Sequence, residues 1–235
     1  MAKGQINVVE SLVGYDWEPV ASGLLAAGVC FAIYKLGLGA MNRAKEPLIP
    51  DEKMSFRNLS ELLAEFIMGL GDGIMGKHNR KYLPFICTLF LYVLVMNLMG
   101  LVPGFSGPTD EIPRGLMFNA GIALTVFFLY NFWGIKEVGF KNYLKHFLGP
   151  VPAIAPLLFL IEIISHMFRP LTLSVRLAGN MTADHTVLST FIDLTKVVIP
   201  VIFYGLGTFV SFIQAFVFTM LTMLYIGLAT AHEEH

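Results

Sequence analysis

The stretch from Val197 to His232 contains no Asp, Glu, Lys or Arg and reads VVIPVIFYGLGTFVSFIQAFVFTMLTMLYIGLATAH. As one continuous helix it would extend about 54 Å, whereas the hydrocarbon core of a bilayer is about 30 Å thick. A helix of this length fits a membrane if it tilts steeply or bends. Pro200 supplies a break near one end, and Gly205 and Gly207 permit close packing against a neighbouring helix.

The composition of the whole chain is that of a membrane protein. Hydrophobic residues make up 55% and charged residues 14%, and the mean hydropathy is +0.67. Soluble domains carry roughly 25% charged residues. The chain has 16 Lys and Arg and 17 Asp and Glu, so its net charge is -1 and it has no basic field to hold nucleic acid. Cys30 and Cys87 lie far apart in apolar runs, which is typical of buried small side chains and not of a disulfide or metal site.

Apolar segments of this kind recur along the chain and predict an all-α, polytopic membrane protein with about five membrane-crossing helices. We treat residues 1–235 as a single membrane domain. A transmembrane helix needs about 20 apolar residues. The expected crossings are 19–41, a hairpin of 82–104 and 115–135 with a turn rich in proline and glycine, and two long, steeply tilted segments, 151–192 and 197–231.

Residues 56–77 follow a different pattern, with apolar side chains at helical spacing on one face and polar ones elsewhere. The apolar positions are Leu59, Leu62, Leu63, Phe66, Ile67 and Leu70. This period predicts an amphipathic helix that lies along the membrane surface. A helix within a soluble loop is the alternative interpretation.

The distribution of Lys and Arg predicts the orientation of the chain. The connection 42–81 holds seven of them and 136–150 holds three, whereas the segments on the opposite side hold Lys3, Arg114 and Lys196. The positive-inside rule therefore places the first two connections in the cytoplasm. With five crossings, the N-terminus is then outside and the C-terminus is cytoplasmic.

Polar residues within the segment 151–192 fall on one helical stripe, spaced three or four apart. With one leucine among them, they are Glu162, His166, Arg169, Leu173, Arg176, Asn180 and Asp184. A charge in a membrane costs about 2.5 to 3.5 kcal/mol on insertion scales, so this stripe is the predicted functional core. Pro170 will kink it without destroying it. For Arg169, a buried ion pair with Glu162 that holds the helices together is an equal alternative.

Arg176 differs from Arg169 because no acidic residue lies three or four positions away on its own helix. A guanidinium does not release its proton at ordinary pH, so Arg176 is a fixed positive charge and a poor proton relay. Such a charge can draw a carboxylate on a neighbouring subunit out of its protonated state. It can also block direct passage of protons from one side to the other.

Three motifs in this order resemble subunit a of F-type rotary ATP synthases. They are Asn97–Gly104 (NLMGLVPG), Pro170–Met181 (PLTLSVRLAGNM) and Gln214–Phe218 (QAFVF). The resemblance covers most of the chain from about residue 80 onward.

The resemblance implies a role for particular residues. Arg176 corresponds to the family's essential arginine, which faces the rotating ring of c subunits. Asn180 and Gln214 match polar positions near that arginine. Glu162, together with Ser165, matches the half-channel on the cytoplasmic side.

The half-channel from the outer side departs from the family's pattern. His185 matches a position that holds Glu or His, but its usual partner position is Gly207 in this chain. Asp184 is a candidate for the missing acid, although neighbouring residues on a helix point in different directions. Gly100 stands where some members have aspartate, so we expect a different set of polar groups on this side.

By this resemblance, the chain is a stator subunit that couples the flow of protons or sodium to ring rotation and ATP synthesis. Its partners would be the c ring, the peripheral-stalk b subunits, the rest of the complex and membrane lipids. We expect no chemistry on ATP, because the chain has no Gly-rich phosphate loop, and no cofactor or metal. The expected location is a bacterial plasma membrane, in preference to a thylakoid membrane.

Two other functions remain as alternatives. A redox subunit could use His166 and His185 as haem ligands, but their 19-residue separation on one segment makes shared ligation awkward. A secondary transporter often has related halves, and this sequence has no visible internal repeat.

Overall fold

The computed structural model describes residues 8–15, 17–43, 56–76, 79–102, 105, 107, 113–148, 155–194 and 198–230. Within these ranges the regular structure is α-helical, without strands. The helices are α1 (Val8–Val13), α2 (Glu18–Arg43), α3 (Phe56–Met75), α4 (Asn79–Leu101), α5 (Arg114–Val138), α6 (Phe140–Leu148), α7 (Ala155–Leu194) and α8 (Val198–Thr230). Five of them, α2, α4, α5, α7 and α8, are long and apolar enough to cross a membrane, which confirms the expected fold class.

The centre of the molecule lies between α4, α5 and α8, with α7 packed along α5 and α3 against α4 and α8. Large side chains fill it, namely Tyr82, Phe90, Tyr130, Phe218 and Met223, together with Ile67 from α3 and Leu173 and Leu177 from α7. These side chains leave polar residues on the same helices with few ways to reach water. Several of these polar residues pair with one another across the helices.

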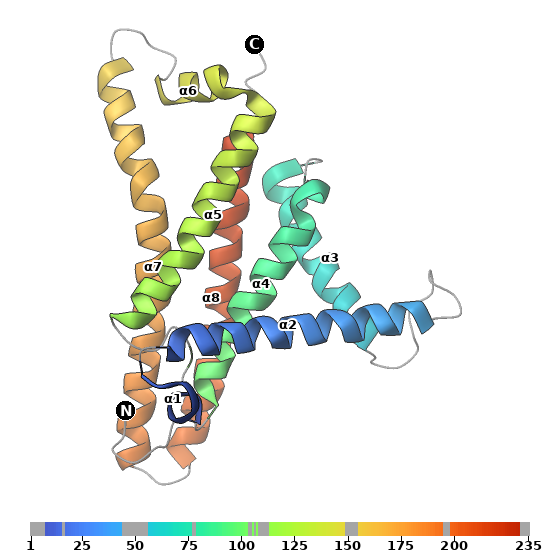
Figure 1. The fold of residues 1–235 in the computed structure, drawn as a ribbon, viewed down its shortest axis with the longest axis vertical. Coiled ribbons are helices and arrows are strands. Elements are labelled where there is room, and N and C mark those ends of the chain that lie inside the picture. The colour runs from blue at the N-terminus through green and yellow to red at the C-terminus, as the bar shows by residue number, and fades with distance from the viewer. Residues whose placement is uncertain are drawn as a thin grey trace.

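The long helices do not run in one direction. In Figure 1, α2 crosses the other helices instead of following them. At 1.5 Å per residue, the 40 residues of α7 extend about 60 Å and the 33 residues of α8 about 50 Å. Both lengths exceed the thickness of the bilayer core, about 30 Å. If α2 stands upright in the membrane, α7 and α8, which it crosses, must lie at a steep tilt to the membrane normal.

The helix ends follow from local chemistry. Helix α4 ends at Leu101, and Pro103 disfavours helical backbone at the residue before it. Helix α5 ends at Val138, where Gly139 adopts a φ of 84° and donates its N–H to Ile135 O. It runs three residues beyond the expected 135, and Glu137 in this extension accepts a hydrogen bond of 2.5 Å from the Tyr82 hydroxyl.

The C-terminal half has a proline inside one long helix and a short helix between two others. Helix α7 continues through Pro170 without a break. Helix α6, which the sequence analysis did not predict, joins α5 to α7. Its signal is present in the sequence, because Phe140, Tyr143 and Leu144 have the spacing of one helical face.

Helices α5 and α8 approach closely at Gly134. A Cβ atom added to this glycine would lie 2.8 Å from the Ala229 carbonyl oxygen and 2.7 Å from Tyr143 Cε2. A real Cβ essentially never makes contacts below 3.0 Å. The absence of a side chain at Gly134 is therefore what allows α5 and α8 to cross this closely. The same glycine gives the ring of Tyr143 its place against α5.

Candidate ion-translocation site

Arg176 is half-buried on α7, between the packed interior and the exposed face of the helix. In the part of the chain that the structure describes, it has no hydrogen bond and no ion pair. A partly buried guanidinium without a counter-charge is unfavourable, because all five of its N–H donors must then find water or an external acceptor. Its charge therefore has to be met by water or by a group beyond the described residues.

The next turn of α7 carries a polar contact to α8. Asn180 Nδ2 donates a hydrogen bond of 2.8 Å to Gln214 Oε1. Gln214 is only 3% exposed, whereas Asn180 is exposed on α7. The structure thus brings these two predicted residues together. Asn180 lies four positions beyond Arg176 on α7, and Gln214 lies on the facing helix α8.

Asp184 lies against Gly207, one further turn along α7. A Cβ atom on Gly207 would be 2.7 Å from Asp184 Oδ2 and 2.8 Å from Leu101 Cδ2. The Asp184 carboxylate therefore occupies the space that a side chain at position 207 would fill. This contact gives a steric reason for the glycine and for its pairing with an acid at 184.

Buried polar groups also lie on α4, α5 and α8. Asn97 on α4 is fully buried, and its Nδ2 donates to Ser211 O on α8 at 3.4 Å. Within the described residues, Asn97 Oδ1, Ser211 Oγ and both polar side-chain atoms of Asn119 have no hydrogen-bond partner. Unpaired buried polar atoms usually mark bound water, so this region suits hydration.

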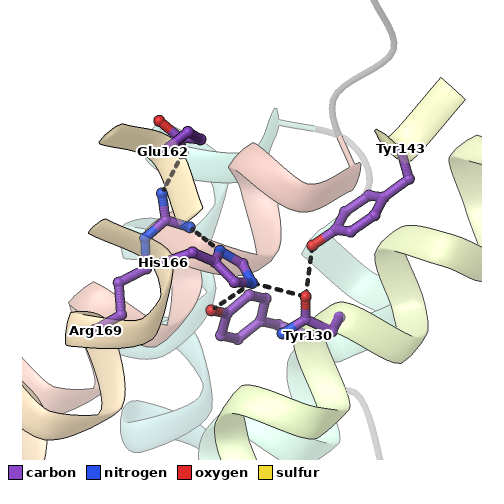
Figure 2. Close-up of polar contacts among 6 residues, drawn as sticks. Tyr130, Tyr143, Glu162, His166 and Arg169 are labelled. Atoms are coloured by element: carbon purple, nitrogen blue, oxygen red, sulfur yellow. Dashed lines mark hydrogen bonds and ion pairs between the residues drawn. The ribbon is translucent and has the colours of Figure 1, made fainter. Parts of the chain in front are cut away.

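A second polar cluster surrounds Glu162, fourteen residues or about 21 Å before Arg176 along α7. Arg169 Nη2 lies 3.1 Å from Glu162 Oε1, and Arg169 Nη1 lies 3.2 Å from His166 Nδ1 (Figure 2). The ion pair between Glu162 and Arg169, one of the two interpretations of Arg169 from the sequence, is therefore present. Its outer end is the carboxylate, since the Glu162 side chain is 45% exposed and that of Arg169 is 20% exposed.

Three members of this second cluster were not predicted from the sequence. His166 Nε2 lies 2.8 Å from Asn131 Oδ1, and Tyr143 donates to that same oxygen at 2.6 Å. The Tyr130 hydroxyl lies 3.5 Å from His166 Nε2. Burial raises the pKa of the Tyr143 phenol, so its hydroxyl keeps its proton and remains a donor. For Asn131, the signal in the sequence is a polar amide within the apolar helix α5, which could have indicated a buried hydrogen bond.

The remaining predicted residues divide into two cases. Ser165 is exposed on α7 and shares its turn with Glu162. The side chain of His185 lies outside the described residues. His166 has protein partners at both ring nitrogens, which argues against its use as a haem ligand.

Comparison of the sequence with known proteins identifies relatives of this chain. A sequence model of the ATP synthase A chain family matches residues 22–227. The chain belongs to the ATP synthase A chain family. It is 41% identical over 221 residues to ATP synthase subunit a of Bdellovibrio bacteriovorus, covering 94% of this chain and 95% of that protein.

Other bacterial members are similarly close to this chain. It is 42% identical over 213 residues to ATP synthase subunit a of Sulfurimonas denitrificans, covering 90% of each. The corresponding protein of Solibacter usitatus is 42% identical over 188 residues, covering 79% of this chain and 78% of that protein. As a member of this family with five apolar helices, the chain is a multi-pass membrane-sector subunit of an ATP synthase.

Proposed function

We propose that this chain forms two ion half-channels against a rotating c ring and couples ion flow to rotation and ATP synthesis. The observation that carries the proposal is Arg176, a half-buried charge without a partner in the described chain. It lies between two polar clusters on the same helix, one at Glu162 and one at Asp184. That order suits a charge that separates two water-accessible paths.

The fixed charge of Arg176 has two consequences for a carboxylate on the ring. It favours the ionised carboxylate when the ring site faces it, because opposite charges attract strongly where the dielectric constant is low. It also repels a cation, so ions cannot pass directly between the two paths. Asn180 and Gln214 line the helix turn beyond it with amide groups that can orient water.

The cytoplasmic half-channel is assigned to the cluster at Glu162. Its carboxylate is partly exposed and paired with Arg169, and the exposed Ser165 lies three residues further on, within the same turn. A partly exposed acid can exchange ions with water. This is the property required where a ring carboxylate gives up its ion.

The outer half-channel is assigned to Asp184 and the buried polar groups of α4, α5 and α8. Asp184 fills the space at Gly207, and Asn97, Asn119 and Ser211 have polar atoms without protein partners among the described residues. Water bound to these atoms would give an ion a polar route to mid-membrane. His185 is included in this path on the basis of the family resemblance.

Ion entry from outside would neutralise a ring carboxylate, which can then turn toward lipid, and the ion would leave on the other side near Glu162. Each elementary charge that crosses is worth about 2.3 kcal/mol per 100 mV. Repeated crossings would supply torque, and ATP would be made in a partner sector and not by this chain. A steep tilt of α7 and α8 would allow them to follow a curved ring surface.

The orientation proposed from the positive charges places the N-terminus outside and the C-terminus in the cytoplasm of a bacterial cell. Helix α3 would then lie at the cytoplasmic surface of the plasma membrane, with exposed Leu59 and Leu62 toward lipid or another subunit. The proposed partners are the c ring, b subunits and membrane lipids.

The test is isolation of the complex through an affinity tag on this chain. We expect a ring of small, hairpin-shaped subunits to copurify and the reconstituted complex to acidify vesicles when it hydrolyses ATP. Sodium uptake in place of acidification would assign the ion as sodium. Isolation without a ring, or a complex that moves neither ion, would contradict the proposal.

A further inference from the structure

The hydrogen bonds around His166 are not used by the proposed ion path, yet they connect three helices to it. His166 is 9% exposed. Its Nδ1 faces Arg169 Nη1 at 3.2 Å and its Nε2 faces Asn131 Oδ1 at 2.8 Å (Figure 2). Each ring nitrogen therefore contacts a different helix element.

The direction of these hydrogen bonds follows from the guanidinium of Arg169. Arginine has only donors and keeps its charge, so His166 Nδ1 must accept the hydrogen bond. The neutral ring then carries its proton on Nε2, which donates to Asn131 Oδ1. An imidazolium would instead turn a second N–H toward the guanidinium and place two positive charges side by side.

Asn131 is fixed independently, so it is a defined anchor for the ring. Its Nδ2 donates to Phe127 O at 2.7 Å, which directs Oδ1 away from the α5 backbone. Tyr143 donates to this oxygen from α6, and its ring packs against Gly134. The orientation of His166 is thus set by residues of α5 and α6.

Arg169 is held by His166 on one side and reaches Glu162 on the other. The two residues of the ion pair are seven positions apart on α7, about two helical turns. The guanidinium also lies over the ring of Tyr225, 5.2 Å from its centroid. An arginine side chain has about 2 kcal/mol of rotamer entropy, so without a fixed acceptor it would spend less time in this extended geometry.

We propose that His166 is a positioning residue for ion release, because its Nδ1 holds the Arg169 guanidinium so that Nη2 stays on the Glu162 carboxylate. The inference rests on the proposed function, since it uses Glu162 as part of the cytoplasmic half-channel. The titratable groups that face His166 from the packed elements are Tyr130 of α5 and Arg169 of α7. Tyr143 of α6 and Tyr225 of α8 complete the surroundings of the cluster.

Two substitutions separate the roles of the ring nitrogens. The amide oxygen of Asn can take the place of Nδ1, and the amide of Gln can take the place of Nε2. His166→Asn therefore keeps an acceptor for Arg169, whereas His166→Gln keeps only the contact to Asn131. A merely structural role, in which His166 ties α7 to α5, would favour the Gln variant.

The measurement is proton conduction by reconstituted complexes, normalised to the amount of assembled complex. We expect His166→Asn to stay within about twofold of the native complex and His166→Gln to lose about tenfold, the effect of one hydrogen bond to a charged group. In an Arg169→Ala background, His166→Gln should cause no further loss. Normal conduction by His166→Gln, a tenfold loss in His166→Asn, or an additive loss in the Arg169→Ala background overturns the inference.

The native complex and an Arg176→Ala complex, measured in parallel, keep this result separate from the proposed function. If the native complex does not pump, the proposed function itself fails. If it pumps and Arg176→Ala abolishes pumping, the proposed function stands whatever the His166 variants do. The inference is then judged by the Asn and Gln variants alone.

Discussion

The contact between Asp184 and Gly207 yields a prediction with a matched control on the same helix. In Gly207→Ala the new Cβ would lie 2.7 Å from Asp184 Oδ2, and an ordinary contact begins at 3.4 Å. The carboxylate must therefore move by about 0.7 Å. Because it is the end of a flexible side chain, we expect the complex to assemble and the outer ion path to be disturbed.

The control is Gly205→Ala, two residues earlier, where nothing lies within 4 Å of the added Cβ. Both substitutions raise helix propensity by roughly 1 kcal/mol, so their difference reports the two close contacts of the new Cβ, with Asp184 and with the end of the Leu101 side chain. We expect Gly207→Ala to reduce proton conduction about fivefold, the equivalent of one lost hydrogen bond of about 1 kcal/mol, and Gly205→Ala to leave it unchanged. Conduction is measured as acid-driven flux through reconstituted complexes. Equal flux in the two variants would show that the contacts at Gly207 have no part in ion conduction.

Two further predictions concern stability. In Gly134→Ala the Cβ meets the Ala229 backbone oxygen at 2.8 Å. We therefore expect the free energy of unfolding to fall by about 1 to 3 kcal/mol and the thermal midpoint of the complex to be lower. The control is Gly121→Ala, which has open space at its Cβ and should not be destabilised. An unchanged midpoint in Gly134→Ala would show that α8 can shift. Tyr82→Phe removes the hydrogen bond to Glu137 and should lower stability by about 1 kcal/mol, measured by the same melt, and a native-like midpoint would contradict the assigned contact.

Much of the helical architecture could be predicted from the sequence, because long apolar runs leave a membrane protein few choices. The segments expected to cross the membrane correspond to α2, α4, α5, α7 and α8. Helix α6 was missed because it is short and carries Lys141 and Lys145, which made its segment resemble a charged connection. The end of α5 was placed too early for a related reason, since Lys136 and Glu137 look like loop residues until Glu137 is seen to meet Tyr82.

The candidate site was predictable where its residues lie on one helix. Glu162, Arg169 and Arg176 share a stripe of α7 because helical spacing alone determines it. The contacts of Asn131 with His166 and of Asp184 with Gly207 depend on how helices cross, which spacing does not specify. The sequence already offered Asp184 as a candidate for the missing acid, and helix packing adds that its carboxylate lies against Gly207.

The separation of two half-channels by Arg176 is tested by ATP-driven proton pumping in vesicles that contain Arg176→Ala complexes. We expect pumping to be abolished while passive proton conduction through the same complexes persists, because the charge that blocks direct passage is gone. Arg80→Ala, which removes an exposed arginine at the start of α4, should pump as the native complex does. Undiminished pumping by assembled Arg176→Ala complexes would contradict the claim.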